Sequence, residues 1–432
     1  MGLSGIERRV CEEIAGRAGA LLEDLRQYVA IPTGGNHRAG LEELRERLTG
    51  RLARLGAAVE TVPGEARPDW LYGNGSGGAW AWSPPTAVCR RDEGVGGEWG
   101  GRTIVLSGHL DTVHDPEGAF RELTVAPDGK TATGPGCVDM KGGLVIAATA
   151  LEALEACGVR VAWTFILNSD EETGSYCSEK AIRAEAARVL GAWERAGAKA
   201  GHEPVGLVFE PATPPPENGL VIERAGSGQF VFEARGKSAH VGREFASGAS
   251  AVTALARCIV DAAGLTDLER GMICNVGPLE GGIATNVVPD LARAWGNVRF
   301  RDQEQGEELA RRLHEIAARH SVGGVRVEAK VSLVRAAKPL TEGTLRLAEV
   351  ARGVSEDLGR PLPFVKTAGV CDGNILQGAG IACIDTLGAR GGGMHTEREW
   401  IELESLVERC QMAAVVMMRL GGGGDEALGI RH

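Results

Sequence analysis

Residues 161–175 read "VAWTFILNSDEETGS", an apolar run that ends in three consecutive acids. The apolar part, 161–168, has the length and the β-branched and aromatic content of a buried strand. Asp170, Glu171 and Glu172 follow it, and taken alone these acids are most simply explained as a solvated loop. The stretch therefore indicates a buried strand with a concentration of negative charge at its carboxyl end.

Further buried strands are predicted at "TIVLSG" (103–108), "GLVFE" (206–210) and "GIACIDTLG" (380–388). Strands that alternate with helices predict an α/β layered domain whose central sheet is mostly parallel and covered on both faces. Helical spacing also occurs twice within residues 5–58. The Gly-, Pro- and Trp-rich segment 62–101 is expected to be an irregular excursion before the first buried strand. The other predicted helices lie at 141–157, 178–198, 342–358 and 402–419.

The pattern changes between residues 224 and 335. Strand, helix, strand, strand, helix and strand follow one another there, which is the order of a ferredoxin-like βαββαβ unit. A unit of this size inside an α/β domain indicates an insertion. We therefore predict a main domain of residues 1–223 and 336–432, interrupted by an inserted domain of residues 224–335.

Composition limits the possible partners. The chain of 432 residues carries a formal net charge of −11, which argues against a nucleic-acid or anionic-membrane surface as its main partner. No stretch approaches 18 uncharged apolar residues, and the first 30 residues carry charges throughout, so we expect a cytoplasmic protein. The ten cysteines form no CxxC pair and are expected to be reduced and mostly buried.

Histidines and acids gather at the predicted strand ends, where open α/β sheets place their ligands. Each has a plain alternative, such as a helix cap or a loop residue, but together they form a nitrogen and oxygen donor set suited to zinc, manganese or cobalt. Five ligands with a shared aspartate fit two cations better than one, and two cations would hold acids that otherwise repel each other. The five candidate ligands are His109, Asp139, Glu172, Glu210 and His395. Asp111 and Glu171 are candidate residues beside them.

The order of the motifs resembles that of the co-catalytic zinc exopeptidase family, which includes glutamate carboxypeptidase, acetylornithine deacetylase, succinyl-diaminopimelate desuccinylase and aminoacylase. The resemblance spans roughly residues 100–405. The glycine turn before Asp139, Gly134-Pro135-Gly136, departs from the family, which commonly has an arginine in this turn. The motifs are "GHLDTV", "GPGCVDMKGG", "SDEETGS", "FEPAT", "GKSAHVG", "ATNVVPD" and "GGGMHTEREW".

The resemblance implies a role for each metal-site residue. Asp139 would bridge two zinc ions, with a cis peptide bond between Asp139 and Met140. Glu171 would be the general acid and base, and Asp111 would support the imidazole of His109. The remaining ligands would be His109 and Glu210 for one ion, and Glu172 and His395 for the other.

The resemblance also implies a lid that forms a homodimer. His240 would reach the partner subunit's active site and help to stabilise the oxyanion. Asn286 and Arg299 would bind the substrate carboxylate or backbone, with Arg335 as a weaker candidate for the same task. A strand-end salt bridge is the alternative for Arg299.

These expectations define a di-metal hydrolase that cleaves an amide bond next to a free carboxylate. The first choice is a glutamate-carboxypeptidase-like metallopeptidase with two divalent ions per subunit, acting on a small peptide or N-acyl amino acid. An N-acyl amino acid deacylase is the alternative. From other classes, a catalytically silent relative that only binds in the cleft remains open, while a structural zinc protein is disfavoured because none of the proposed ligands is cysteine.

Overall fold

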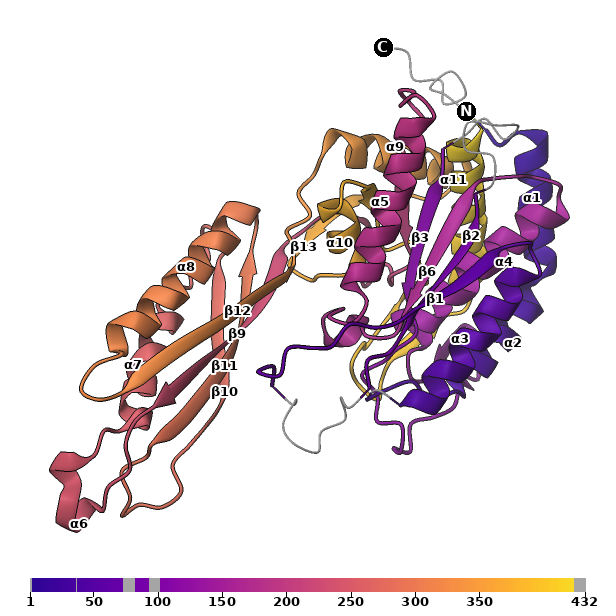
Figure 1. The fold of residues 1–432 in the computed structure, drawn as a ribbon. Coiled ribbons are helices and arrows are strands. Elements are labelled where there is room, and N and C mark those ends of the chain that lie inside the picture. Colours follow the sequence, from indigo (N-terminus) through magenta and orange to yellow (C-terminus); the bar gives the residue numbers. More distant parts are fainter. Residues whose placement is uncertain (1, 36, 73–81, 93–101, 423–432) are drawn as a thin grey trace.

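A computed structural model describes residues 2–35, 37–72, 82–92 and 102–422 of the chain. The described chain forms two lobes, a larger one around a six-stranded sheet and a smaller one around a four-stranded sheet (Figure 1). Helices α1 (Gly5–Gly16) and α11 (Glu404–Gly421) pack together in the larger lobe. The smaller lobe is therefore inserted between the two halves of the larger one.

The six strands of the larger lobe lie in the order β1-β2-β6-β3-β7-β14. Strands β6, β3, β7 and β14 are parallel, whereas β1 and β2 are antiparallel to their neighbours. This confirms the predicted α/β class with a mostly parallel central sheet. His109 pairs with Asn168 at the last register position of β3 and β6, so both strands end at one edge. The strands are β1 (Ala58–Val62), β2 (Thr86–Arg91), β3 (Ile104–His109), β6 (Trp163–Asn168), β7 (Val205–Val208) and β14 (Ala382–Ile384).

Helices cover both faces of this sheet. Alternate strand residues point to opposite sides, and apolar residues on each side are buried against helices. Val105 and Ile166 pack with α5 and α10 on one face. Leu106 and Phe165 pack with the other helices on the opposite face. These helices, beyond α1 and α11, are α2 (Ala18–Val29), α3 (Arg38–Ala53), α4 (Gly142–Ala156), α5 (Glu179–Arg195), α9 (Glu342–Asp357) and α10 (Asp372–Gly378).

The segment 62–101 differs from the prediction. It contains β2, a buried strand between β1 and β6, so the expectation of an irregular excursion is wrong for Thr86–Arg91. The two arginines at the strand's end concealed it, and Arg90 is neutralised by Glu185 of α5 at 2.7 Å, a partner far away in the sequence. Residues 73–81 and 93–101 lie outside the described part. The N-terminal helical region also forms three helices rather than two.

Two small sheets join distant segments of the larger lobe. In the first, β16 (Trp400–Glu402) lies between β15 (Gly391–Gly392) and β5 (Thr131–Thr133), with β4 (Thr124–Val125) beside β5. This pairing brings the segment that follows His395 next to the turn that precedes Asp139. In the second, β8 (Leu220–Arg224) pairs in parallel with β13 (Phe364–Thr367).

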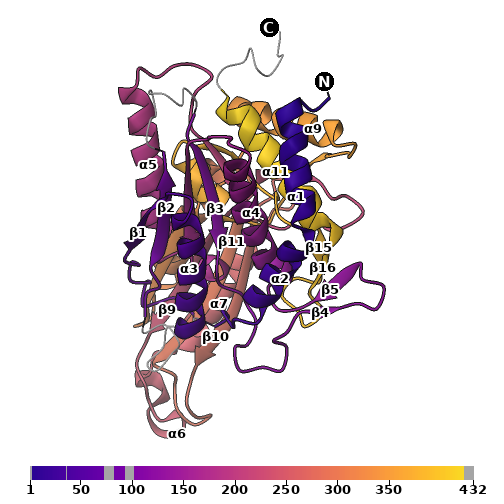
Figure 2. The ribbon, with the colours of Figure 1, turned by 90° about the vertical axis from the view of Figure 1, so that its right-hand side faces the viewer.

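The smaller lobe has the predicted ferredoxin-like arrangement. Its antiparallel strands lie in the order β10-β11-β9-β12, and α7 and α8 pack on the sheet around Phe230, Phe232 and Leu313. The short helix α6 (Val241–Glu244) lies at the end farthest from the larger lobe (Figures 1 and 2). The elements are β9 (Gly226–Arg235), α7 (Ala251–Ala263), β10 (Ile273–Gly281), β11 (Leu291–Phe300), α8 (Gln303–His320) and β12 (Arg326–Arg335).

All ten cysteines are unpaired, and all except Cys157 are buried, as expected for thiols that serve packing. Among the helices of the described ranges, none combines the length and the apolar character that a membrane crossing requires.

Candidate metal centre

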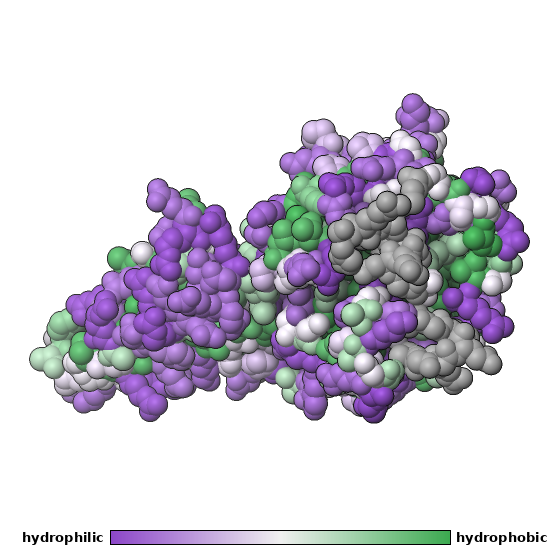
Figure 3. Space-filling model, turned by 90° about the horizontal axis from the view of Figure 1, so that it is seen from above, coloured by the Kyte–Doolittle hydropathy of each residue, from purple (hydrophilic) through white to green (hydrophobic). Residues whose placement is uncertain are grey.

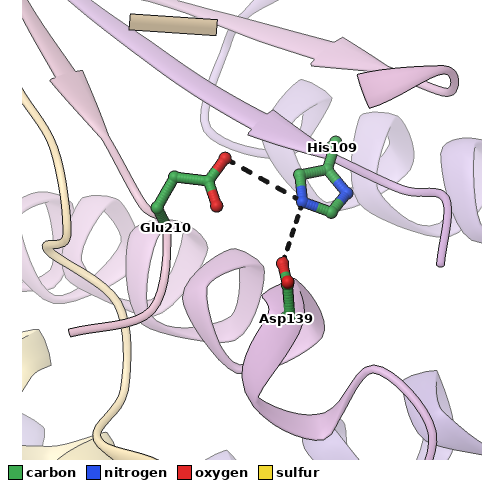
Figure 4. A group of neighbouring side chains, drawn as sticks. All are labelled: His109, Asp139 and Glu210. Atoms are coloured by element: carbon green, nitrogen blue, oxygen red, sulfur yellow. Dashed lines mark hydrogen bonds and ion pairs between the residues drawn. The ribbon is translucent and has the colours of Figure 1, made fainter. Parts of the chain in front are cut away.

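Two groups of candidate ligands meet at the carboxyl edge of the central sheet, and they share Asp139. One group is His109, Asp139 and Glu210, whose ligand atoms lie within 4.8 Å of one another (Figure 4). The other is Asp139, Glu172 and His395, within the same limit. The structure thus brings together all five side chains that the sequence proposed as ligands.

The contacts in the two groups fall on opposite oxygens of Asp139. Oδ1 lies 3.2 Å from Nε2 of His109, and Oδ2 lies 3.4 Å from Nε2 of His395. Nε2 of His109 is 3.9 Å from Glu210, and Nε2 of His395 is 3.3 Å from Glu172. A carboxylate used on both sides in this way has the geometry of a bridging ligand.

The local backbone places each ligand. His109 ends β3, Glu210 follows β7, and Glu172 lies in a short helical turn after β6. Asp139 lies in the turn before α4, and the peptide bond Asp139–Met140 is cis, as predicted. His395 lies in the loop after β15 with a φ of 64°.

Asp111 approaches the imidazole of His109 with both its backbone carbonyl and its carboxylate. The closest acceptor for Nδ1 of His109 is the backbone carbonyl of Asp111, at 2.9 Å, while the carboxylate is 3.5 Å away. That carboxylate accepts hydrogen bonds from the backbone N–H groups of Glu171 and Glu172, at 3.2 and 3.0 Å. Asp111 therefore links the imidazole of His109 to the turn that carries Glu171 and Glu172.

The charges at this site fit a pair of divalent cations. Burial raises the pKa of Glu210 and of Glu172, because each carboxylate is removed from water among other acids. Burial alone would also raise the pKa of Asp139, but hydrogen bonds from His109 and His395 lower it. Oε1 of Glu172 is buried and has no hydrogen-bond partner among the described residues. Because such acids are stable as anions only with positive partners, and because the donors are imidazole and carboxylate, the residues fit zinc, manganese or cobalt.

Glu171 lines, together with Asp139, Glu172 and Glu210, a cavity at this edge of the sheet, but it belongs to neither ligand group. Its Oε1 lies 2.7 Å from Nη2 of Arg335, which also donates to the Glu171 carbonyl and to Oγ of Ser175. Burial raises the pKa of Glu171 to about 8, against the opposing effect of Arg335. Arg335, a sequence candidate for substrate binding, lines this cavity and is also buried against Glu171.

Glu399 is a residue of this site that sequence reasoning missed. Its buried carboxylate accepts hydrogen bonds from three backbone N–H groups in the turn that carries Asp139. It also accepts one from Nε2 of His114, at 2.6 Å. The available signal was an acid four residues after His395, within a motif already singled out. The three N–H groups belong to Gly136, Val138 and Asp139.

A cavity of about 850 Å³ opens over the ligands and is lined by both lobes. Arg299 contributes to it from the smaller lobe. Its Nη1 donates to Oδ1 of Asn297 at 2.6 Å and to Oγ of Ser227, and no described carboxylate forms an ion pair with it. Burial, with Arg335 adding repulsion, lowers its pKa. The strand-end salt bridge considered for Arg299 is therefore absent from the described structure.

His240 and Asn286 do not join this cavity. The backbone N–H of Val241 donates to the carbonyl of Asn286 at 3.0 Å, so the two candidates lie next to each other. Both are exposed at the outer end of the smaller lobe, where His240 precedes α6 (Figure 1). Within one chain the structure does not bring either residue to the metal ligands.

The sequence model of the family described as "Peptidase family M20/M25/M40" matches residues 105–419. The chain is 26% identical over 328 residues to carboxypeptidase G2 of Pseudomonas sp. (strain RS-16), covering 75% of each chain. It is 33% identical over 282 residues to the succinyl-diaminopimelate desuccinylase of Cereibacter sphaeroides (strain KD131 / KCTC 12085), covering 61% of this chain and 69% of that one. These matches confirm the resemblance inferred from the motifs.

A solved structure agrees on the fold. The M20 family metallo-carboxypeptidase Sso-CP2 from Sulfolobus solfataricus superposes with a TM-score of 0.69, covering 93% of this chain and 99% of that one. The two sequences are 15% identical. At this identity the likeness concerns the architecture alone.

Proposed function

The chain belongs to peptidase family M20/M25/M40, and from this premise we propose that it is a di-metal hydrolase that cleaves an amide bond next to a free carboxylate. The observation that carries the proposal is the pair of ligand groups joined through Asp139, with Glu171 and Arg299 lining the same cavity. These groups supply metal binding, proton transfer and carboxylate binding in one place.

The metal requirement is two divalent cations per subunit, with zinc as the first candidate and manganese or cobalt as alternatives. When bound, such a pair polarises a carbonyl oxygen and lowers the pKa of water from about 16 toward 7. The residues that would hold them are His109, Asp139 and Glu210 on one side, and Asp139, Glu172 and His395 on the other.

Glu171 is the proposed general base and acid. Its carboxylate accepts a proton from the attacking water and later gives that proton to the nitrogen of the leaving amine, so no proton is lost over one turnover. The 2.7 Å ion pair with Arg335 supports this role, because it fixes the carboxylate in a buried position at the cavity wall. Arg335 is thus a positioning residue for Glu171.

Arg299 is the proposed binder of the substrate carboxylate. A guanidinium pairs with a carboxylate through two parallel hydrogen bonds, and Arg299 has no acidic partner among the described residues. This supports a glutamate-carboxypeptidase-like activity that releases a C-terminal amino acid. The similarity to a protein named carboxypeptidase G2 supports the same choice.

An N-acyl amino acid deacylase is the second candidate. The similarity to a protein named succinyl-diaminopimelate desuccinylase favours it, and Arg299 would bind the free carboxylate of that substrate class equally well. The two activities differ in whether a peptidyl or a simple acyl group is removed.

A substrate panel tests the proposal. The chain, loaded in turn with zinc, manganese or cobalt, is incubated with dipeptides of varied C-terminal residues, with N-acetyl and N-succinyl amino acids, and with the C-terminally amidated form of each. We expect chelator-sensitive hydrolysis of substrates with a free carboxylate and little of the amides. Tight binding of these compounds with no hydrolysis under any metal would instead favour a catalytically silent binding protein.

We further propose a homodimer formed through the smaller lobe. Strand β10 is an edge of its sheet, and Leu279, Ile283 and Phe245 are 64, 90 and 67% exposed near the lobe's outer end. In Figure 3, hydrophobic side chains are visible at that end. An edge strand with exposed apolar residues is suited to pairing with a second copy.

In such a dimer, His240 and Asn286 would act in the partner subunit's cavity, where His240 would stabilise the oxyanion. Purified mixed dimers test this. One subunit carries Glu171→Gln and the other His240→Ala. If His240 acts in trans, the mixed dimer retains one complete site and about half of the activity, whereas both parent homodimers are nearly inactive. An inactive mixed dimer, or a monomer in sedimentation experiments, would refute the assignment.

A further inference from the structure

A second cavity, of about 640 Å³, lies in the larger lobe and shares no lining residue with the cavity over the metal ligands. Its walls come from the loop at 216–218, from the end of α9 with the loop that follows it, and from the first half of α11. Leu362 and Met412 form part of its buried interior, while Glu217 and Glu356 are exposed at its rim.

Arg409 is a charged residue in the buried part of this cavity. Its side chain is only 5% exposed. Nη2 donates a 3.3 Å hydrogen bond to the carbonyl of Asn218, and Nη1 lies 4.0 Å from the sulfur of Met412. Among the described residues, no carboxylate forms an ion pair with this guanidinium. Arg409 is therefore a buried cation whose protein contacts are weak and neutral.

The acids around Arg409 are already engaged by other arginines. Glu408 forms ion pairs with Arg360 at 2.6 Å and with Arg390 at 2.5 Å. Arg390 also pairs with Glu402 at 2.7 Å. Burial, followed by repulsion from Arg390, lowers the pKa of Arg409 to about 10. Glu402 and Glu408 are thus paired with Arg360 and Arg390, and within this group of five side chains the guanidinium of Arg409 is one positive charge in excess.

A buried charge without a counter-ion is unfavourable, and a guanidinium is the side chain best shaped to bind a carboxylate or phosphate through two hydrogen bonds. The cavity leaves room for such a group beside Arg409. Oδ1 of Asn218 is also buried, accepts no hydrogen bond within the described part of the chain, and offers an acceptor to a donor on the same ligand. We propose that this cavity binds a small ligand that presents one oxyanion, a carboxylate or a phosphate, to Arg409.

The rim restricts the size and charge of this ligand. Glu217 and Glu356 are exposed where a ligand would enter, and they repel a long polyanion. A compact ligand with a single oxyanion, with or without an amino group, fits this charge pattern. The site is separate from the proposed hydrolysis and does not depend on it.

Thermal unfolding of the metal-loaded chain tests the proposal. Sodium phosphate and sodium glutamate are titrated at constant ionic strength, balanced with sodium chloride, and compared in wild type, Arg409→Gln and Arg346→Gln. Arg346 is a matched control, because it lies on α9, is exposed, pairs with Glu342 at 2.6 Å and does not line the cavity. At ten times the Kd of the ligand, we expect a saturable rise in Tm of about 1–2 °C in wild type and in Arg346→Gln.

The Arg409→Gln variant is expected to lose this rise. A rise that persists unchanged in Arg409→Gln would place the anion elsewhere, for instance on the metals, and no saturable rise in wild type with either anion would equally overturn the proposal. The anion that gives the larger rise distinguishes phosphate from carboxylate. If Arg409→Gln does not fold, wild-type crystals soaked with each anion decide the question, because the proposal requires its density against the guanidinium of Arg409.

Discussion

Glu399 and His114 form a 2.6 Å hydrogen bond next to the turn that carries Asp139, and both side chains are largely buried. The Glu399 carboxylate accepts this hydrogen bond from His114 and three more from backbone N–H groups of the turn before α4. Because Asp139 is in that turn, its position depends on an acid 260 residues later in the chain. The ligand shared by both groups is therefore oriented by hydrogen bonds that reach it through the backbone.

The first prediction concerns this carboxylate. In Glu399→Gln, an amide N–H₂ replaces one acceptor oxygen and faces groups that are themselves donors. We expect the affinity for zinc to fall by about 10–100-fold, measured by competition with a chromophoric chelator. Glu402→Gln is the control, since Glu402 lies three residues later, in β16, and pairs with Arg390. Unchanged zinc affinity in Glu399→Gln would show that the turn holds Asp139 without the carboxylate.

The second prediction separates metal binding from proton transfer. Glu171→Gln keeps the size of the side chain but cannot accept a proton. We expect kcat to fall by about 10²–10⁴-fold while metal analysis still finds two ions per subunit. Glu223→Gln serves as the control, because Glu223 is paired with Lys366 outside the cavity. If Glu171→Gln retained its turnover, another residue would have to carry the proton.

The third prediction addresses substrate recognition. Arg299→Met removes the guanidinium that faces the cavity but retains much of its apolar stem. A charge-assisted hydrogen-bonded pair contributes about 1.5–3 kcal/mol, so kcat/KM for substrates with a free carboxylate should fall by about 10–150-fold. The residual rate on amidated substrates should barely change. Arg293→Met, on the same strand and paired with Glu233, is the matched control. An equal loss on both substrate types would argue against carboxylate binding.

The sequence predicted the features that depend on local pattern. Apolar runs of strand length gave the central sheet, and the acids and histidines at their ends gave the ligand groups, because parallel strands bring their carboxyl ends to one edge. Of the three acids at 170–172, Glu171 and Glu172 line the cavity over the candidate ligands, and Asp170 does not. Asp170 instead accepts a 2.6 Å hydrogen bond from the backbone N–H of Cys177, and burial raises its pKa to about 6.

The features that were missed depend on contacts between distant segments. Strand β2 could not be recognised because Arg90 is neutralised by Glu185 on α5, and nothing near it in the sequence announces that partner. Glu399 holds the turn of Asp139 only because β16 pairs with β5. The pairing of Arg335 with Glu171 likewise depends on how the smaller lobe returns to the larger one. The roles of Arg90, Glu399 and Arg335 could not be predicted because their partners are distant in the sequence.

The segments that join the lobes provide the last prediction. Arg224 and Lys338 lie where the chain leaves and re-enters the larger lobe, and their backbones exchange hydrogen bonds of 2.9 and 3.0 Å. Asp385 binds both side chains in the interior. Its carboxylate accepts two hydrogen bonds from Arg224, at 2.7 and 3.0 Å, and lies 3.3 Å from Nζ of Lys338.

Asp385→Asn leaves these two buried cations without their anion. We expect the free energy of unfolding at pH 7 to fall by about 3–5 kcal/mol, measured by urea denaturation. The control, Glu315→Gln, breaks a surface pair with Arg311 and should cost less than about 1 kcal/mol.

The pH dependence of this loss has a defined sign. Burial alone would raise the pKa of Asp385, but Arg224 and Lys338 outweigh it, and the pKa is lowered in the folded protein. A carboxyl group with a lowered folded pKa stabilises the fold fully above its unfolded pKa of about 3.9, and this contribution is lost as the pH falls through the folded value. The difference between wild type and Asp385→Asn should therefore be constant from about pH 5 to 8 and shrink below about pH 4. A difference that widened in acid would mean that Asp385 is protonated in the native state and does not neutralise the two cations.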